Sequence, residues 1–316
     1  MAKTKFCIGV SAISDTYSGV ILDQWGVLHN GRHLYEGVIE CMDQLRARKK
    51  TIILLSNALT SAAEEKAKLK KMGLGSEYYD EIMTSGEYMR RGLSLKEAKP
   101  FDKLGKNAFL FEQKKDFSLL DDIDVNIVDT VQDADFSLLT GLEKVTDMKT
   151  IDTTLRETVR RRLPCICANP DSRQLMTGDY IMGSGLLARK YQDFGGVVHF
   201  IGKPHSLIFN SCVRFFQEKE IYPGSIVVIG DTMAHDIIGG SLVNIDTALI
   251  KSGLHAPLFH RARSPAETDK LLKGLIAQYN NTMPRYLIDR FQWGEKLPDR
   301  KHKVWKRRRT AAKSSS

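Results

Sequence analysis

Four short apolar runs, each followed at once by a polar residue of different chemistry, constrain most what this chain can fold into. The runs are rich in Ile, Val and Leu, which is typical of strands buried on both faces of a parallel sheet. They end at residues 22, 55, 202 and 230, and the polar residues that follow are Asp23, Ser56, Lys203 and Asp231. Because parallel sheets bind ligands beyond the carboxyl ends of their strands, we expect these side chains to converge on one crevice.

These four side chains together favour phosphoryl transfer. A carboxylate can act as the nucleophile, a hydroxyl and an ammonium can hold phosphoryl oxygens, and a divalent cation between two carboxylates offsets their repulsion. Each residue taken singly is more simply interpreted as a polar residue that ends a strand. The ordered set of four therefore carries the prediction.

The segments between the runs predict crossover helices. Gly37–Lys50 has apolar residues at helical spacing and leads into the run at 51–55, which predicts a first βαβ unit. Thr60 or Ser61 can cap a second helix that extends to Lys71. The pattern further predicts a helix over 207–219, a short strand and turn over 81–86, and strands over 225–229 and 246–250. The predicted fold class is α/β, with a Rossmann-like open parallel-sheet core.

A second α/β module interrupts this core. Residues 87–195 alternate helix and strand patterns of their own, and their strand candidates are 108–111, 125–128, 136–139 and 165–168. Because the site candidates lie on both sides of this stretch, we interpret it as an inserted α/β cap domain that closes over the crevice and excludes water. The predicted organisation is a discontinuous core of residues 1–86 and 196–299, a cap of residues 87–195, and a basic, disordered tail of residues 300–316.

The composition favours a cytoplasmic protein. A chain of 316 residues with 42% hydrophobic content can bury a substantial core. It has no apolar run of about 18 residues to span a membrane, and no apolar stretch of signal-peptide length follows its start. Its five cysteines lack the spacing of a zinc site or a disulfide framework, so we expect them to be reduced. Cys165 and Cys167 are expected to pack on one face of a strand, and no zinc is predicted.

The positive charge is concentrated at the carboxyl end. Arg300–Ser316 holds eight Lys or Arg residues and no acid, which leaves +1 of the formal net charge of +9 for the remainder. Nucleic-acid binding is therefore not expected as the main role, since basic residues are not interleaved with a stacking platform. The run Lys306–Arg309 leaves nuclear import open, although such runs are more often solvated chain ends.

Five segments of the chain form a specific set, although none of them is specific alone. They are DQWGVLHNG at 23–31, LSNA at 55–58, CANPD at 167–171, GKPH at 202–205 and GDTMAHD at 230–236. This set resembles the motifs of the haloacid dehalogenase-like (HAD) hydrolases, specifically the class IIA members, which carry a large α/β cap between the second and third motifs. The resemblance covers nearly the whole chain.

The resemblance implies a role for each motif residue. Asp23 would be the nucleophile that attacks phosphorus and forms an aspartyl-phosphate. Ser56 would hydrogen-bond the transferring phosphoryl oxygens, and Lys203 would offset negative charge on the nucleophile and the phosphate.

The resemblance also implies a magnesium site and substrate contacts. Asp23, the backbone carbonyl of Trp25 and Asp231 would hold Mg²⁺, with Asp236 positioning a metal-bound water, and oxygen ligands of this kind suit Mg²⁺. The substrate-binding residues implied in the same way are Asn57, Asn169 and Asp171.

Trp25 departs from the family's phosphatases, which usually carry there a second Asp that acts as acid and base. An indole N–H is only a donor and cannot do this. Dehalogenases of the superfamily tend to have an aromatic residue at this position and need no Mg²⁺, but Asp231 and Asp236 argue that a metal site remains. Trp25 can also simply wall the pocket and offer an aromatic face to an organic leaving group.

Two explanations for the missing acid remain open. The aspartyl-phosphate can turn over slowly, because loss of a general acid or base typically costs about 10²- to 10⁴-fold in rate. Alternatively, an imidazole replaces it, since histidine titrates near neutral pH. The candidates are His29, His205 and His235, and His29 is the best placed because it lies just after the nucleophile turn.

The leading interpretation is a Mg²⁺-dependent phosphatase that acts on a small organic phosphate monoester. One alternative is a catalytically weak relative that serves as a binding or regulatory protein. The other is a hydrolase of a non-phosphate bond such as carbon–halogen. A small phosphorylated substrate is the expected partner, and a homodimer is left open because caps of this class can join protomers.

Overall fold

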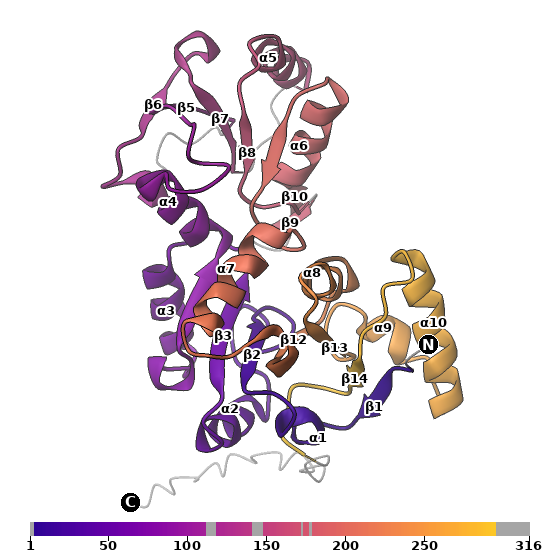
Figure 1. Cartoon of the computed structure of the whole chain (residues 1–316). Coiled ribbons are helices and arrows are strands. Elements are labelled where there is room, and N and C mark those ends of the chain that lie inside the picture. Colours follow the sequence, from indigo (N-terminus) through magenta and orange to yellow (C-terminus); the bar gives the residue numbers. More distant parts are fainter. Residues whose placement is uncertain (1–2, 112–117, 141–147, 172, 177–178, 295–316) are drawn as a thin grey trace, which may run out of the picture.

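Two parallel sheets with flanking helices form the molecule, and in Figure 1 the smaller one lies above the larger one. The computed structural model describes residues 3–111, 118–140, 148–171, 173–176 and 179–294. The predicted fold class, an α/β protein with a Rossmann-like parallel-sheet core and an inserted α/β cap, is confirmed. The predicted tail, residues 300–316, lies outside the described residues.

The core sheet has seven parallel strands among the described residues, in the order β1-β14-β13-β12-β2-β3-β4. Their bounds are β1 Lys5–Cys7, β2 Gly19–Asp23, β3 Thr51–Ser56, β4 Glu81–Thr84, β12 Ile226–Gly230, β13 Asp246–Ile250 and β14 Tyr286–Ile288. Every residue of β2 and β12 is buried. The carboxyl ends of these two adjacent strands therefore lie in the middle of the sheet edge at which ligands bind in such folds.

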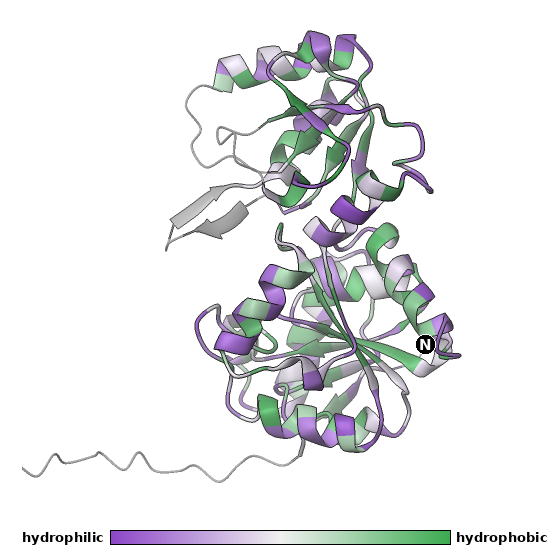
Figure 2. Ribbon diagram, turned by 90° about the vertical axis from the view of Figure 1, so that its left-hand side faces the viewer, coloured by the Kyte–Doolittle hydropathy of each residue, from purple (hydrophilic) through white to green (hydrophobic). Residues whose placement is uncertain are grey.

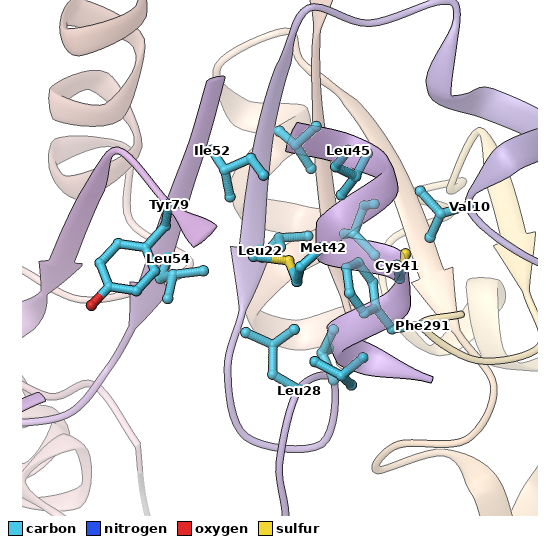
Figure 3. Close-up of a cluster of buried hydrophobic side chains, with 14 of the residues drawn as sticks. Val10, Leu22, Leu28, Cys41, Met42, Leu45, Ile52, Leu54, Tyr79 and Phe291 are labelled. Carbon is cyan, nitrogen blue, oxygen red and sulfur yellow. The ribbon is translucent and has the colours of Figure 1, made fainter. Parts of the chain in front are cut away.

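Alternate residues of β2 pack against opposite layers. Leu22 belongs to an apolar cluster that includes Met42 (Figure 3), whereas Ile21 packs in a cluster with Phe209 and Phe216. Burial of an apolar side chain of this size contributes about 1.5–3 kcal/mol. The two layers therefore hold the end of β2, and with it Asp23, in a fixed position.

Helices supply these layers. The core helices are α1 Ser11–Ser14, α2 Val38–Ala47, α3 Ala62–Lys71, α7 Ser206–Gln217, α8 Ile238–Leu242, α9 Ala256–Phe259 and α10 Pro265–Gln278. The shorter helical segments are η1 Ser76–Tyr78, η2 Ser118–Leu120, η3 Val131–Asp133, η4 Pro223–Ser225 and the π-helical η5 Met233–Ile237.

No helix in the described part of the chain is both long and apolar enough to cross a membrane.

α3 begins where the sequence predicts it. Ser61 Oγ accepts the backbone N–H of Glu64 at 3.2 Å, and the Glu64 carboxylate accepts the N–H of Ser61 at 2.7 Å. This reciprocal pair is a capping box, which satisfies two amides that the first helical turn leaves without a partner.

The cap contains a second parallel sheet, with the strand order β11-β8-β7-β5-β6. The bounds are β5 Asn107–Leu110, β6 Asn126–Val128, β7 Phe136–Leu139, β8 Cys165–Cys167 and β11 Val198–Phe200. Its helices are α4 Ser85–Leu95, α5 Met148–Arg160 and α6 Ser184–Asp193, and β9 Arg173–Met176 pairs antiparallel with β10 Asp179–Met182. In Figure 2 apolar residues gather in the interiors of both the cap and the core.

β11 corrects the predicted organisation. Val198–Phe200 falls in the segment 196–299 that was assigned to the core, yet it pairs with β8 in the cap sheet. A half-buried three-residue strand has the same sequence pattern whichever sheet it joins, so its pattern does not reveal its partner. Lys203 therefore follows a cap strand, and the expectation that four strand ends of one sheet converge is wrong for this residue.

The chain passes between core and cap at two points that lie side by side. It leaves the core after β4, at Ser85, and returns at Gly202. Ser85 Oγ donates to Asn57 Oδ1 at 3.3 Å, and a Cβ at Gly202 would lie only 2.6 Å from each of these two atoms. The absence of a side chain at Gly202 is therefore what allows the two crossings to approach.

All five cysteines are free thiols. Cys165 and Cys167 pack in one buried cluster with Leu187 and Tyr191 of α6. The predicted placement of this pair on one face of a strand is confirmed, because alternate residues of β8 point to the same side.

Candidate active site

Three carboxylates from separate core elements meet at the carboxyl edge of the core sheet. Asp23 is the last residue of β2, Asp231 follows β12, and Asp236 lies in η5. One oxygen of each lies within 4.8 Å of the others, and all three side chains are buried. Among the described residues this is the only such group of potential metal ligands.

Lys203 joins two of these carboxylates. Its Nζ donates to Oδ1 of Asp23 and to Oδ1 of Asp236, each at 2.7 Å, and the residue is only 3% exposed. Burial alone would lower the pKa of this ammonium, but the two carboxylates outweigh burial and hold the pKa above its usual range. Lys203 is therefore a fixed positive charge beside the nucleophile candidate.

Burial and mutual repulsion perturb the carboxylates themselves. Burial is the largest cause that raises the pKa of Asp23 to about 6, with Lys203 opposing it and Asp236 adding to it. The pKa of Asp231 rises to about 8, because the group is buried and faces both Asp23 and Asp236. For Asp236 the effect of burial is overcome by Lys203, so its pKa falls below the usual range.

This arrangement fits a divalent cation. Three carboxylates share one ammonium, and burial, together with the repulsion between the carboxylates, raises the pKa of Asp23 and Asp231, so a further positive charge would stabilise the group. The donors are oxygens, which are the ligands Mg²⁺ prefers in proteins. Both oxygens of Asp236 already accept hydrogen bonds, from Lys203 and from Thr232, which suits this residue to orienting a metal-bound water.

Sequence reasoning missed two groups that orient the acids. Thr232 donates to Asp236 Oδ2 through its N–H at 3.1 Å and its Oγ1 at 2.8 Å, while Oγ1 also accepts the N–H of His235. The N–H of Leu254 donates to Asp231 Oδ2 at 2.7 Å. The position of Thr232 just before a helical segment was a signal for a cap, but a backbone amide such as that of Leu254 leaves no sequence signal.

Ser56 is the last residue of β3 and Asn57 begins the loop that follows, beside the end of β2. Asp23 pairs with Leu55 across the two strands, so Ser56 is one residue beyond the nucleophile candidate. The Asn57 side chain binds the backbone of Lys203 at both ends, because its Oδ1 accepts the Lys203 N–H at 2.7 Å and its Nδ2 donates to the Lys203 carbonyl at 3.1 Å. This amide therefore fixes the loop that carries the lysine.

The cap contributes the loop with Asn169 and Asp171. Asn169 Oδ1 accepts the N–H of Asp171 at 2.9 Å. Asp171 Oδ1 receives Asn57 Nδ2 at 3.3 Å and lies 3.0 Å from Nε2 of His235. The structure thus brings this loop against the core, at the Asn57 amide.

Trp25 is 49% exposed although it lies two residues after Asp23. Its indole Nε1 lies over Gly31, where a Cβ would approach it to 3.3 Å. The turn that follows Trp25 depends on Gly26, which has φ +87° and whose Cβ would collide with the Asp231 carboxylate. The nucleophile loop thus approaches Asp231 closely while presenting an aromatic ring outward.

The histidines occupy different environments. His29 is 1% exposed, its Nδ1 accepts the N–H of Gly31 at 3.0 Å, and its Nε2 has no hydrogen-bond partner among the described residues. Burial, followed by the charge of Lys68, lowers the pKa of His29 to about 4, so the ring is neutral at pH 7. His205 stacks on Phe200 with 4.6 Å between ring centroids. His29 as acid and base stays a prediction, and the interaction of His235 with the cap loop was not foreseen.

Two family models match the chain, one over the first part of the core and the beginning of the cap, and the other over the second part of the core. A model described as a haloacid dehalogenase-like hydrolase matches residues 20–126, and a second, described as HAD-hydrolase-like, matches residues 200–276. The chain belongs to the haloacid dehalogenase-like hydrolases, which confirms the predicted family. No protein among the curated ones matches it.

Several solved structures share the fold. A haloacid dehalogenase-like hydrolase from Brucella suis is 25% identical, with a TM-score of 0.70 over 90% of this chain and 99% of that one. A possible sugar phosphatase from Cytophaga hutchinsonii is 20% identical, with a TM-score of 0.70 over 93% and 100% of the two chains. A p-nitrophenyl phosphatase from Archaeoglobus fulgidus is 20% identical, with a TM-score of 0.67 over 87% and 96%.

Proposed function

We propose that this hydrolase is a Mg²⁺-dependent phosphatase that acts on a small organic phosphate monoester. The observation that carries the proposal is the buried Lys203 ammonium, held at 2.7 Å from both Asp23 and Asp236 and next to Asp231. A nucleophile, a fixed positive charge and an oxygen-rich metal site are the components that phosphoryl transfer requires. The phosphatase descriptions of two structural neighbours support the same class.

The proposed reaction has two steps. A carboxylate oxygen of Asp23 attacks phosphorus while the bond to the leaving oxygen breaks, which gives an aspartyl-phosphate and the leaving group as its anion, and this anion then takes a proton from water. Water then attacks that phosphorus, releases inorganic phosphate and restores the Asp23 carboxylate. Ser56 donates to the phosphoryl oxygens, and Lys203 offsets the charge that develops on them.

Mg²⁺, bound by Asp23, the carbonyl of Trp25 and Asp231 with Asp236 orienting its water, would neutralise charge on the carboxylates and the phosphoryl oxygens. Lys203 meanwhile holds the Asp23 carboxylate in position, and Asn57 holds the loop that carries Lys203. Asn169 and Asp171, together with Asn57, are the proposed contacts for the rest of the substrate.

Trp25 shapes the proposed substrate preference. The indole cannot protonate a leaving oxygen, so esters whose leaving group departs as a stable anion are expected to react fastest. Its exposed ring also offers an apolar face to that leaving group. We therefore propose aryl or other acidic leaving groups as the preferred class.

The test is phosphate release from a panel of aryl and alkyl phosphates, with and without Mg²⁺. Asp23→Asn keeps the shape of the nucleophile but removes its charge. The matched control is Asp15→Asn, at a solvent-exposed position of the core domain. Metal-dependent turnover that only Asp23→Asn abolishes supports the proposal.

Trp25 also favours a second candidate function, a weakly catalytic relative that binds a phosphate ligand. Binding of Mg²⁺ and inorganic phosphate without release of phosphate from any ester would support this binding protein and reject the phosphatase.

A further inference from the structure

His235 provides a direct contact between the core and the cap. It belongs to η5 of the core, which continues into α8 below the cap in Figure 1. Its Nε2 lies 3.0 Å from Oδ1 of Asp171 in the cap loop. We propose that His235 is a positioning residue that fastens the cap loop 169–171 to the core beside the active site.

The contact extends to the proposed catalytic lysine. Asp171 Oδ1 also accepts a hydrogen bond from Asn57 Nδ2 at 3.3 Å. The Asn57 side chain in turn bonds to both the N–H and the carbonyl of Lys203. Lys203 in turn holds Asp23. A continuous series of hydrogen bonds thus runs from His235 through the cap loop to the nucleophile candidate.

The cap loop is rigid enough to transmit this contact. Asp171 is held by Asn169 Oδ1 through its N–H, and its carbonyl accepts the N–H of Gly185 at 3.1 Å. Ser184 Oγ donates to the carbonyl of Asn169 at 2.7 Å. Ser184 and Gly185 are the first two residues of α6, so a restraint on Asp171 also restrains this cap helix.

The contact is suited to being broken and remade. The side chains of His235 and Asp171 are 31% and 25% exposed, so water can replace each of them when the cap opens. A neutral imidazole that carries its proton on Nε2 donates to the carboxylate as an imidazolium does. The link therefore needs a donor at this position and no particular charge on His235.

Hydrogen–deuterium exchange of the full chain tests the link without any substrate. In His235→Ala we expect peptides covering 165–171 and the start of α6 to exchange about tenfold faster, as the loss of one hydrogen bond to a charged group predicts, while β2 and β3 stay unchanged. His235→Gln, which keeps a donor, should restore most of the protection. His260→Ala, an exposed histidine that ends α9, is the matched control.

The catalytic consequence rests on the proposed phosphatase activity. With the loop freed, substrate binding should weaken more than chemistry, because Lys203 keeps both of its carboxylates. We expect KM to rise about tenfold in His235→Ala with a smaller fall in kcat. His235→Ala combined with Asp171→Ala should be no worse than Asp171→Ala alone.

The two proposals fail in different ways. If the loop 169–171 exchanges at an unchanged rate in both His235→Ala and Asp171→Ala, the proposed role of the His235–Asp171 contact is overturned. If His235→Ala does not fold, Asp171→Ala alone provides this test. Faster exchange without turnover by the unmodified protein rejects the phosphatase but upholds the link. Turnover with an unchanged KM in His235→Ala overturns the positioning role.

Discussion

Trp25 is the residue that most distinguishes this site. It stands two residues after Asp23, and its ring is half exposed over Gly31. An aromatic ring there leaves the proposed reaction without a proton donor at the leaving oxygen, because an indole N–H does not titrate as an acid in water. The rate should therefore depend steeply on the acidity of the leaving alcohol.

Trp25→Asp should raise kcat for alkyl phosphates by about 10²-fold, the lower end of what a general acid contributes, and should change aryl phosphates much less. Steady-state kinetics with a matched pair of alkyl and aryl esters measures this. Trp25→Phe is the control, since it keeps an aromatic face without an acid. If Trp25→Asp gave no gain with alkyl esters, another residue would already supply the proton.

The buried imidazole of His29 is expected to lower the free energy of unfolding at low pH. Its pKa falls from 6.5 to about 4 on folding, so between these values the unfolded chain binds a proton that the folded one does not. Stability is then complete above pH 6.5 and declines as the pH falls towards 4. The loss between pH 7 and pH 5 should be about 2 kcal/mol.

His29→Gln removes this titration. Urea unfolding at pH 7 and pH 5 should show a decline in unfolding free energy smaller by about 2 kcal/mol than in the unmodified protein. His33→Gln, at an exposed position in the same turn, should leave the decline as it is. Equal declines for all three proteins would contradict the buried, neutral state of His29.

At the scale of the elements, α3 offers a direct measure of local sequence effects. Ser61→Ala removes the acceptor for the Glu64 N–H and should lower the unfolding free energy by about 1 kcal/mol, as measured by chemical denaturation. Ser94→Ala, at an exposed position of α4, should be close to neutral. Turnover should not change in either variant, and an effect of Ser61→Ala no larger than that of Ser94→Ala would argue against the capping box.

Elements with strong local signals were predictable from the sequence. The strand 246–250 and the start of α3 match the structure, because continuous apolar runs and capping residues act within a few neighbours along the chain. β11 was placed in the wrong sheet, because the pattern of a short strand does not show which sheet it joins, and β1 and β14 were not predicted.

The same distinction applies to the site. Asp23, Asp231 and Asp236 were predicted as candidates, because each stands in a motif or directly after an apolar run, and the structure brings them together. The contact of His235 with Asp171 joins residues 64 positions apart in the chain and depends on how the cap sits on the core. No local pattern encodes such a contact.

At the scale of the whole molecule, nearly all of the net positive charge lies in one segment of the sequence. Residues 300–316 hold eight basic residues, and the remainder has a net charge of +1. Deleting residues 300–316 should abolish any affinity for nucleic acid or anionic lipid at low salt while leaving the turnover of small esters unchanged. Filter binding and phosphate release measure the two effects, and affinity that survives the deletion would refute the view that the folded body is nearly neutral.

The two chain crossings at Ser85 and Gly202 meet at one place, beside Asn57. A domain attached through two adjacent strands of chain behaves as if it were mounted on a single pivot, and it can be exchanged as a module without rethreading the core. In this hydrolase the pivot adjoins the loop that carries Lys203, so an exchange of caps would retain the nucleophile and the phosphate-binding groups. Selection could in this way alter which molecule is recognised while the chemistry at phosphorus is inherited intact.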